Sequence, residues 1–375
     1  MPKVLMVSQP SVAGVAQCVL DWSVGLRHRG WDVQVAAPAE GDLLPWCEQG
    51  GIPATAWESV RSPYAQLLPE TNTLRHIIRG SRPDIVVLHS SKAGLDGRLV
   101  LRGSLPTVFV PHAWSFDAAT GAAGTAALQW ERFAARRWTD AIICVSSAEF
   151  RRGVAAKIRA DYHVARNGVN ISAVTAALGG QPRSTIRADL GLSPQDRVAV
   201  CVGRLAPQKG QDVLIKAWSG VSGPDDRRLV LVGDGPDEDM LRSRATDDSS
   251  ITFTGGVDRP TALRWLAAGD VVVVPSRWEG MALVPLEALA VGTPVVASDV
   301  TGISEAISTD VGTLVPPDDP AALAAALGSW LTRPDAELTH VRHLAAVIAE
   351  RDFSMTATVD AVNDALTSCL AKASA

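Results

Sequence analysis

The stretch VVVVPSRWEGMALVPLEALAVGTPVVA, residues 271–297, contains a strand, a loop, a helix and a second strand in close succession. Val271–Val274 is a continuous apolar run of β-branched residues, and Pro294–Ala297 is a second apolar run. Between these two runs, the sequence predicts a loop and then a helix that runs to about Val291. Short apolar strands joined by helices are typical of a parallel sheet covered on both faces. The stretch therefore predicts a doubly wound α/β domain, whose ligands bind at the carboxyl ends of the strands.

Two glutamates flank the start of this predicted helix. Glu279 lies in the predicted loop, and Glu287 lies about two turns down the predicted helix. Eight helical residues correspond to an offset of ~80° and a rise of ~12 Å. A pair so placed does not share one proton or one metal ion, but it can contact both ends of one elongated ligand. Because the helix N-terminus between them suits a phosphate, the pattern indicates a nucleotide sugar.

The strand–helix alternation extends over most of the 375 residues, a length that favours two domains. The first domain is predicted over residues 1–170 and the second over 171–353, with a linker from Asn170 to Ser184. A final helix at about 354–375 is expected to pack back on the first domain. Apart from the two runs described above, the predicted strands are 4–7, 33–36, 54–56, 85–88, 107–110, 141–145, 198–202, 229–232 and 251–253.

Composition excludes several classes of protein. The formal net charge of −5 argues against nucleic acid as the main partner. The five cysteines are odd in number and form no CxxC pair, so a reducing compartment is expected. No apolar run approaches the ~20 residues of a membrane span. We expect a cytoplasmic protein with at most peripheral contact with the inner face of a membrane.

The loop 203–210 follows the first strand of the second domain and carries Arg204 and Lys209. Lys209 lies near a predicted helix N-terminus, where the macrodipole disfavours a cation. A diphosphate between the two side chains would resolve this conflict, while exposure of both to water is the alternative. Gly233–Pro236 follows the next strand, where a ligand-binding turn and a plain tight turn are equally compatible with the sequence.

Two histidines follow neighbouring strands of the first domain. His112 lies after the strand 107–110, and His89 ends the strand before it. Both positions suit a ligand at the carboxyl ends of a parallel sheet, and a structural histidine is the alternative for each. The basic run from Arg151 to Arg159 is more typical of a solvated helix face than of a site for an anionic lipid or acceptor.

Taken together, these segments resemble the retaining glycosyltransferases of the GT-B fold, family 4. The most specific element is the Glu279-x7-Glu287 spacing, with Pro275-Ser276 before it and Gly292–Val296 after it. The remaining matching motifs are Gly203–Gly210, Gly233–Pro236 and Asn167–Val169. The resemblance implies two Rossmann-like domains, a first that binds the acceptor and a second that binds the donor.

The resemblance also implies roles for individual residues. Arg204 and Lys209 would hold the donor diphosphate, Glu287 the ribose hydroxyls, and Glu279 the hydroxyls of the transferred sugar. His112 would contact that sugar near the reacting carbon. Backbone amides of about Met281, Ala282, Leu283 and Val284 would lie over the phosphates. Gly14, Gly203 and Gly235 are further candidates for binding the donor. The candidates on the acceptor side are His89, Ser90 and Trp114.

The expected activity is transfer of a sugar from a nucleoside-diphosphate sugar to an acceptor hydroxyl, with retention and with neither cofactor nor metal. A UDP-sugar is favoured as donor and a GDP-sugar is second. The acceptor is left open between a saccharide, a lipid-linked acceptor and a small molecule, because Ala13 stands where many relatives have a glycine. A sugar-nucleotide epimerase or phosphorylase and a non-catalytic nucleotide-sugar-binding protein are the alternatives.

Overall fold

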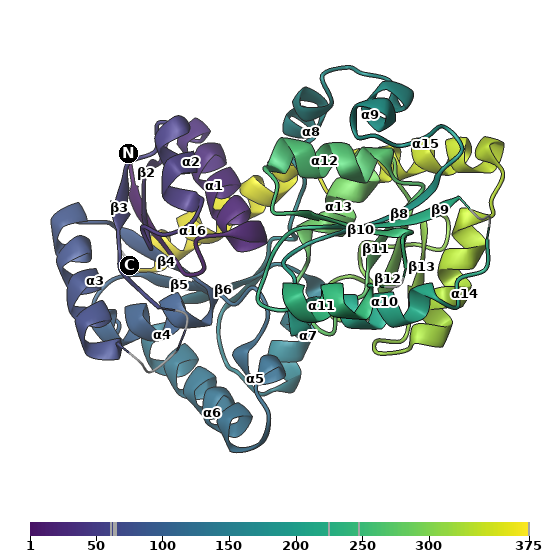
Figure 1. Cartoon of the computed structure of the whole chain (residues 1–375). Helices are drawn as coiled ribbons and strands as arrows, with labels where there is room; N and C mark the ends of the chain where they lie inside the picture. The colour runs from purple at the N-terminus through teal and green to yellow at the C-terminus, as the bar shows by residue number, and fades with distance from the viewer. Residues whose placement is uncertain (61, 63–65, 224–225, 247, 374–375) are drawn as a thin grey trace. The chain divides into compact units, whose positions relative to one another are not determined.

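A computed structural model describes residues 1–60, 62, 66–223, 226–246 and 248–373. The chain divides into two compact units (Figure 1): Met1–Asn167 with Met355–Ala375, and Gly168–Ser354. The first boundary lies three residues before the predicted 170, and the second lies one residue from the predicted 353. Of the predicted final helix, residues 374–375 lie outside the described part of the chain. Each unit is a doubly wound α/β structure of the kind that the sequence predicts.

The first unit contains a parallel seven-stranded sheet in the order β3-β2-β1-β4-β5-β6-β7. Helix α1 packs against α2 and α16, while α4 packs against α3 and α6, so two groups of helices cover the sheet. The strand order reverses between β1 and β4, and this switch point is where such sheets bind ligands. The strands are β1 (Lys3–Ser8), β2 (Asp32–Ala37), β3 (Ala54–Ala56), β4 (Ile85–His89), β5 (Thr107–Val110), β6 (Ala141–Cys144) and β7 (Tyr162–Val164). The helices are α1 (Ala13–His28), α2 (Leu43–Gln49), α3 (Leu67–Ser81), α4 (Ser90–Leu101), α5 (Ser115–Ala118), α6 (Gly121–Trp138), α7 (Ser147–Ala155) and α16 (Met355–Ala373).

The second unit contains a parallel six-stranded sheet in the order β10-β9-β8-β11-β12-β13. Its switch point lies between β8 and β11, so the loops that follow these two strands meet at one edge of the sheet. The strands are β8 (Arg197–Val202), β9 (Arg227–Val232), β10 (Ile251–Gly255), β11 (Val271–Val274), β12 (Val295–Ser298) and β13 (Gly312–Val315). The helices are α8 (Ile171–Leu178), α9 (Arg183–Asp189), the 3-10 turn η1 (Pro207–Lys209), α10 (Gln211–Trp218), α11 (Glu238–Arg244), α12 (Arg259–Ala268), α13 (Leu283–Ala290), α14 (Pro320–Leu331) and α15 (Asp335–Asp352).

The predicted linker from Asn170 to Ser184 is wrong. The segment contains α8 and the start of α9, and both helices pack against α12. The Asn170 side chain accepts a hydrogen bond from the backbone N–H of Ala173 and so caps α8, while Gly179 ends the helix in the left-handed conformation. The turn-forming residues that suggested a linker are therefore the start and stop signals of short helices.

Two edge strands, β7 and β13, were not predicted. Tyr162 and His163 in β7 are only partly buried, and so are the two central residues of β13. Edge strands are covered on fewer sides than central ones, so their sequences lack the continuous apolar run of Val271–Val274, in which every residue is buried. Neither β7 nor β13 contains such a run.

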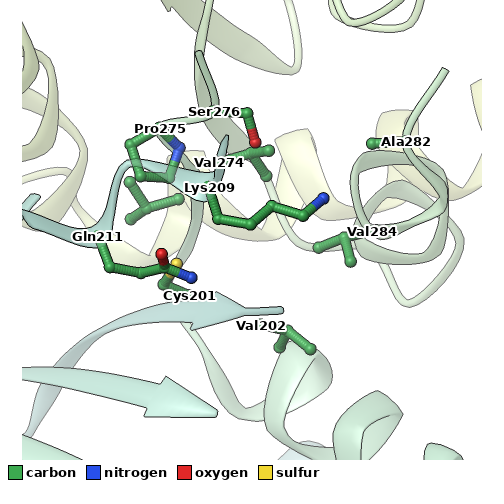
Figure 2. Close-up of a pocket in the computed structure, with 10 residues that line it drawn as sticks. Cys201, Val202, Lys209, Gln211, Val274, Pro275, Ser276, Ala282 and Val284 are labelled. Carbon is green, nitrogen blue, oxygen red and sulfur yellow. The ribbon is translucent and has the colours of Figure 1, made fainter. Parts of the chain in front are cut away.

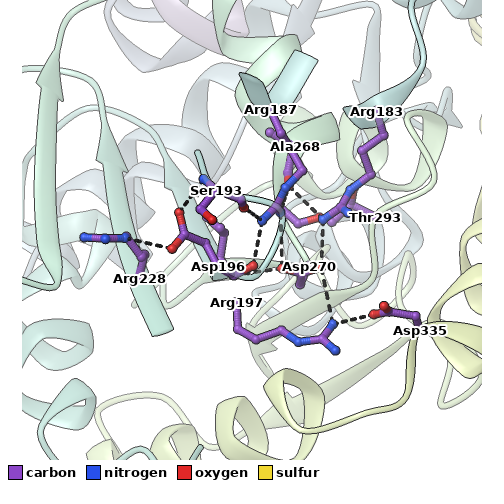
Figure 3. Close-up of polar contacts among 12 residues, drawn as sticks. Arg183, Arg187, Ser193, Asp196, Arg197, Arg228, Ala268, Asp270, Thr293 and Asp335 are labelled. Atoms are coloured by element: carbon purple, nitrogen blue, oxygen red, sulfur yellow. Dashed lines mark hydrogen bonds and ion pairs between the residues drawn. The ribbon is translucent and has the colours of Figure 1, made fainter. Parts of the chain in front are cut away.

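A cluster of arginines, most of them partly buried, surrounds the buried Asp270, the residue that precedes β11 (Figure 3). Asp270 is 3% exposed, and its Oδ1 accepts a 2.7 Å hydrogen bond from Arg183. Its Oδ2 accepts from Arg187 at 3.4 Å and from the backbone N–H of Val198 at 2.9 Å. Arg342 lies 3.6 Å from Oδ1, and burial lowers the pKa of its guanidinium to about 10. The cluster therefore ties α9, β8 and α15 to the amino end of β11.

Candidate active site

Lys209 ends the turn η1, at the carboxyl edge of the second sheet. The next residue, Gly210, has φ +66 and is the N-cap of α10. A Cβ at Gly210 would lie 2.1 Å from the carbonyl oxygen of Pro275, which follows β11. Only glycine permits both this conformation and this approach. The close contact holds the loop after β8 against the loop after β11.

Polar contacts join these two loops further. The backbone N–H of Arg277 donates to the carbonyl of Gln208 at 2.8 Å, and the Gln208 side chain donates to the carbonyl of Trp278 at 3.0 Å. The Arg277 guanidinium forms a bidentate pair with Asp212, at 3.0 and 2.9 Å. Sequence reasoning missed Gln208, Asp212 and Arg277, because only the tertiary structure shows that the loops meet.

Glu279 is the counter-ion of Lys209. The Lys209 Nζ lies 2.6 Å from Glu279 Oε1, which also accepts a 2.8 Å hydrogen bond from the Ser276 hydroxyl. Glu279 is 8% exposed, while the Lys209 side chain is 26% exposed. Figure 2 shows the Lys209 side chain extending through a small pocket between Pro275 and Val284. The sequence analysis considered a phosphate or water as the neighbour of Lys209, whereas the structure places a carboxylate there.

Arg204 lies five residues before Lys209, in the same loop. Its side chain is exposed and makes no ion pair with any residue that the structure describes. Its carbonyl accepts a 3.0 Å hydrogen bond from the Gln211 side chain, which fixes the backbone of the loop. The loop therefore presents an exposed guanidinium and a partly exposed ammonium at the carboxyl edge of the sheet.

Glu287 is the fifth residue of α13, so it lies just over one turn into the helix rather than two turns down it. The helix begins only at Leu283, after an irregular loop. Because residues 279–282 are not helical, the predicted rise of ~12 Å between Glu279 and Glu287 does not apply. Arg259, the first residue of α12, donates to Glu287 Oε1 through Nε at 3.1 Å and through Nη2 at 3.0 Å. Glu287 is thus held by an arginine that the sequence analysis did not single out.

Residues 281–284 lead into α13, which begins at Leu283. Ala282 is the N-cap, and no described side chain caps the helix there. The side chains of Met281 and Leu283 are buried, at 4% and 9% exposure, so the predicted contact of these residues with a ligand involves their backbone. Val284 and Ala282 line the pocket beside Lys209. The N-terminus of α13 and Lys209 therefore face the same small space.

The predicted glycine positions lie at strand ends. Gly203 directly follows β8, and its N–H donates to the carbonyl of Val232 at 2.9 Å. Gly235 follows β9 with φ +156, and a Cβ there would lie 2.3 Å from the carbonyl oxygen of Leu205. This contact shows that Gly235 is required for packing between two loops. In the first unit, Gly14 is exposed near the start of α1, where Ala13 has φ +59.

In the first unit, His89 and His112 form a stacked pair. The Nδ1 of His89 lies 2.9 Å from the Nε2 of His112, and the ring centroids are 5.2 Å apart. Trp22 of α1 packs edge-on against His89 at 5.3 Å. Burial lowers the pKa of His112 to about 3 and also lowers the pKa of His89, so both rings are neutral near pH 7. One ring therefore donates a proton to the hydrogen bond and the other accepts it.

Two of the candidates on the acceptor side are corrected by their burial. His89 is 0% exposed and Trp114 is 2% exposed, so neither side chain faces an acceptor. The ring of His89 is in contact with that of His112. Trp114 is part of the core and stacks on Phe116. The third candidate, Ser90, is partly buried, has φ +73 and donates from its hydroxyl to the carbonyl of Gln9. His112 itself is only partly buried and lies two residues after the end of β5.

Glu149 of α7 is a buried carboxylate that the sequence analysis did not select. It is 0% exposed, and burial raises its pKa to about 7, although hydrogen bonds from Ala113 and Val145 oppose that shift. Its N–H donates to the hydroxyl of Ser146, the N-cap of α7. The pattern Ser146-x-x-Glu149 has the form of a capping box, which was the signal available in the sequence.

Among the described residues, no group of three or more histidine, cysteine, aspartate or glutamate side chains has the arrangement of a metal site. Within the same part of the chain, none of the helices is both long and apolar enough to cross a membrane.

The predicted basic run from Arg151 to Arg159 is partly paired within the first unit. Its Arg152 lies 2.5 Å from Asp117.

Comparisons with known proteins place the chain in a family. Residues 12–173 match the model described as Glycosyltransferase Family 4, and residues 196–333 match that of Glycosyl transferases group 1. A phosphatidyl-myo-inositol mannosyltransferase of Mycobacterium leprae is 31% identical over 362 residues, which cover 92% of this chain and 90% of that protein. The chain belongs to the family 4 glycosyltransferases.

Other relatives match over a smaller part. A D-inositol 3-phosphate glycosyltransferase of Jonesia denitrificans is 36% identical over 168 residues, 42% of this chain and 39% of that protein. The match thus spans less than half of that relative. The structure is similar to that of Anabaena HepE in complex with UDP and glucose, with a TM-score of 0.83 and 23% identity, covering 98% of this chain and 100% of that one. This likeness confirms the GT-B fold of the glycosyltransferase family.

Proposed function

We propose that this family 4 glycosyltransferase transfers a sugar from a nucleoside-diphosphate sugar to an acceptor hydroxyl, with retention of configuration and without a metal ion. The Lys209–Glu279 pair at the switch point of the second unit carries the proposal. The pair lies beside the N-terminus of α13, which favours an anion. A cation, a carboxylate that can accept hydrogen bonds from sugar hydroxyls, and a helix N-terminus thus lie together where doubly wound sheets bind nucleotides.

Donor binding would exchange the partner of Lys209. A diphosphate carries more negative charge than the single carboxylate of Glu279, so it competes for the ammonium group. Exposed Arg204 adds a second cation to the same loop. Once Lys209 turns to the diphosphate, Glu279 Oε1 keeps its hydrogen bond from Ser276 and accepts a second one from a hydroxyl of the sugar.

Glu287 would bind the ribose. Both hydrogen bonds from Arg259 go to Oε1, so Oε2 is the oxygen that would accept from the ribose hydroxyls. Arg259 also fixes the rotamer of Glu287 before the donor arrives, which lowers the entropy lost on binding.

The leaving nucleoside diphosphate develops negative charge as the glycosidic bond breaks. Lys209, Arg204 and the amides at the start of α13 would stabilise that charge, and prearranged stabilisation of this kind is usually the largest contribution to catalysis. Retention would follow from attack of the acceptor on the face that the diphosphate leaves, with a phosphate oxygen taking the proton of the acceptor hydroxyl. In this scheme the cationic side chains supply the neutralisation that a metal ion supplies elsewhere.

The donor base is open between uridine and guanosine. The printed name of a Corynebacterium glutamicum relative, 35% identical over 177 residues, is GDP-mannose-dependent, whereas HepE was solved with UDP and glucose. Relatives named for inositol-containing acceptors support a polyhydroxylated acceptor, either free or linked to a lipid.

The test measures binding and turnover with UDP-, GDP- and ADP-sugars in the presence of a chelator. We expect one nucleotide to bind, as measured by calorimetry, and mass spectrometry to find a glycoside formed from inositol-type or lipid-linked acceptors. The anomeric coupling constant of that product tests retention. Binding without any product would identify a sensor, an isomerised free sugar would identify an epimerase, and loss of activity with the chelator would contradict metal independence.

A further inference from the structure

The backbone that carries His112 is strained. His112 has φ +52 and Ala113 has φ +94, two consecutive non-glycine residues with positive φ. A side chain with a Cβ disfavours this region, and φ near +94 lies outside even the usual left-handed well. Strain of this kind persists only where the surroundings hold the backbone in place, and it concentrates at functional sites.

Glu149 provides that hold from the next element of the fold. Its Oε1 accepts the backbone N–H of Ala113 at 2.7 Å, and its Oε2 accepts the N–H of Val145 at 2.8 Å. Its own carbonyl accepts the indole N–H of Trp114 at 2.9 Å. One residue thus binds two consecutive residues of the loop after β5, and also the first residue of the loop after β6.

Local capping of α7 does not account for this arrangement. A capping glutamate bonds only to the start of its own helix, whereas one oxygen of Glu149 reaches Ala113, 36 residues earlier. The cost of burying a full carboxylate is large unless hydrogen bonds offset it, and here both oxygens accept from backbone N–H groups. The carboxylate is therefore matched to the strained form of the loop.

We propose that Glu149 is a positioning residue that clamps the segment His112–Trp114 in its strained conformation and so orients the His112 ring. The role of His112 toward the sugar rests on the proposed function, whereas the clamp itself does not. Without the clamp, Ala113 would relax toward negative φ. The ring of His112 would then move relative to His89, its partner in the 2.9 Å hydrogen bond.

The experiment compares Glu149→Gln with Glu131→Gln. Glutamine keeps the shape of the side chain, but it turns an N–H₂ group toward one of the two backbone donors. Glu131 is a matched control, because it is also a buried carboxylate of the first unit, 1% exposed and paired with Arg98 at 2.8 and 3.0 Å. Both changes are also made in an Ala113→Gly background, where glycine adopts φ +94 without strain. Assays run above pH 7, where the wild-type carboxylate is ionised.

For Glu149→Gln we expect kcat to fall about 10- to 100-fold, because misplacing a group by about 1 Å has effects of this size. The affinity for the bare nucleotide should change less than about twofold, since its proposed ligands lie in the second unit. In the Ala113→Gly background the loss should shrink by about fivefold or more, as expected for directly coupled residues. Equal losses for Glu149→Gln and Glu131→Gln, with no rescue by Ala113→Gly, would overturn the proposal.

A second measurement needs no substrate. Long-range ¹H–¹⁵N spectra of protein labelled at the histidines report the tautomer and environment of the His89–His112 pair. We expect these resonances to move in Glu149→Gln and to return in the Ala113→Gly background, while the Glu131→Gln spectrum keeps them. If the wild type transfers no sugar yet the resonances move, the clamp stands and the proposed function fails. Unchanged resonances in Glu149→Gln would refute the clamp.

Should Glu149→Gln not fold, Trp114→Phe tests the same contact. It removes the indole N–H that donates to the carbonyl of Glu149, together with part of the ring volume, and keeps a smaller aromatic ring in the core. Loss of one neutral hydrogen bond predicts a fall in kcat of about two- to tenfold together with a smaller movement of the histidine resonances. Wild-type kcat and resonances in this variant would contradict the clamp.

Discussion

Two buried carboxylates lie near the two ends of β11 and have opposite surroundings. Asp270, before the strand, has Arg183, Arg187, Arg197 and Arg342 within 4.0 Å, and both of its oxygens accept hydrogen bonds. Among the residues that the structure describes, Glu279, after the strand, pairs with one cation, Lys209, and the bonds from Lys209 and Ser276 both go to Oε1. The charge of Asp270 is saturated by its surroundings, whereas that of Glu279 depends on one movable partner.

The difference follows from the geometry of a parallel sheet. The amino ends of the strands are covered by helices and connections of the unit itself, so a charge there must be compensated within the chain. The carboxyl ends at a switch point are open to ligands. A buried ion pair contributes little net stability by itself, because the desolvation of both charges opposes their attraction. Asp270 therefore organises the fold, whereas Glu279, in the proposed function, gives up its cation to the donor diphosphate.

Removing the charge of Asp270 should have the largest effect on stability. Asp270→Asn would leave the buried Arg187 and the partly buried Arg183 and Arg342 without their counter-ion, which predicts a loss of about 3–5 kcal/mol in the free energy of unfolding. Asp335→Asn is the matched control, because Asp335 pairs with Arg197 of the same cluster but its side chain is 84% exposed, and it should cost at most about 1 kcal/mol. Urea denaturation measures both. Equal effects of the two changes would remove the distinction between a saturated and an exposed carboxylate.

Removing the cation of the Lys209–Glu279 pair should act on catalysis. Lys209→Ala is expected to lower kcat about 10²- to 10³-fold, the size found when one group that stabilises developing charge is deleted. Its unfolding free energy should change less than that of Asp270→Asn, because the Lys209 side chain is partly solvated. Lys216→Ala, an exposed lysine on α10, is the control and should keep wild-type rates. Steady-state kinetics with the donor identified by calorimetry decide the matter, and near-normal turnover in Lys209→Ala would refute the diphosphate role.

The sequence predicted one end of β11 better than the other. Local patterns of apolar and turn residues predict the strand Val271–Val274. They also predict the loop that carries Glu279 and the glycines at strand ends. Asp270 was overlooked because its partners come from α9, β8 and α15, which no local pattern connects. The same reason applies to Arg259 beside Glu287 and to Glu149 beside Ala113. Burial likewise depends on tertiary packing, which is why His89 and Trp114 were assigned to the acceptor side.

The smallest of the three effects, and the sharpest for the comparison, is expected for Glu279→Gln. Loss of a charged hydrogen-bond acceptor for the sugar predicts a fall in kcat of about 10- to 100-fold. The bare nucleoside diphosphate should bind at least as tightly as to the wild type, because Lys209 no longer has a carboxylate competing for it. Calorimetry and kinetics on the same preparations separate the two quantities. The control is Glu238→Gln, which changes a partly exposed glutamate paired with Arg242. Weaker binding of the nucleotide with unchanged transfer would show that Glu279 holds the nucleotide rather than the sugar, and that its pairing with Lys209 is as structural as the cluster around Asp270.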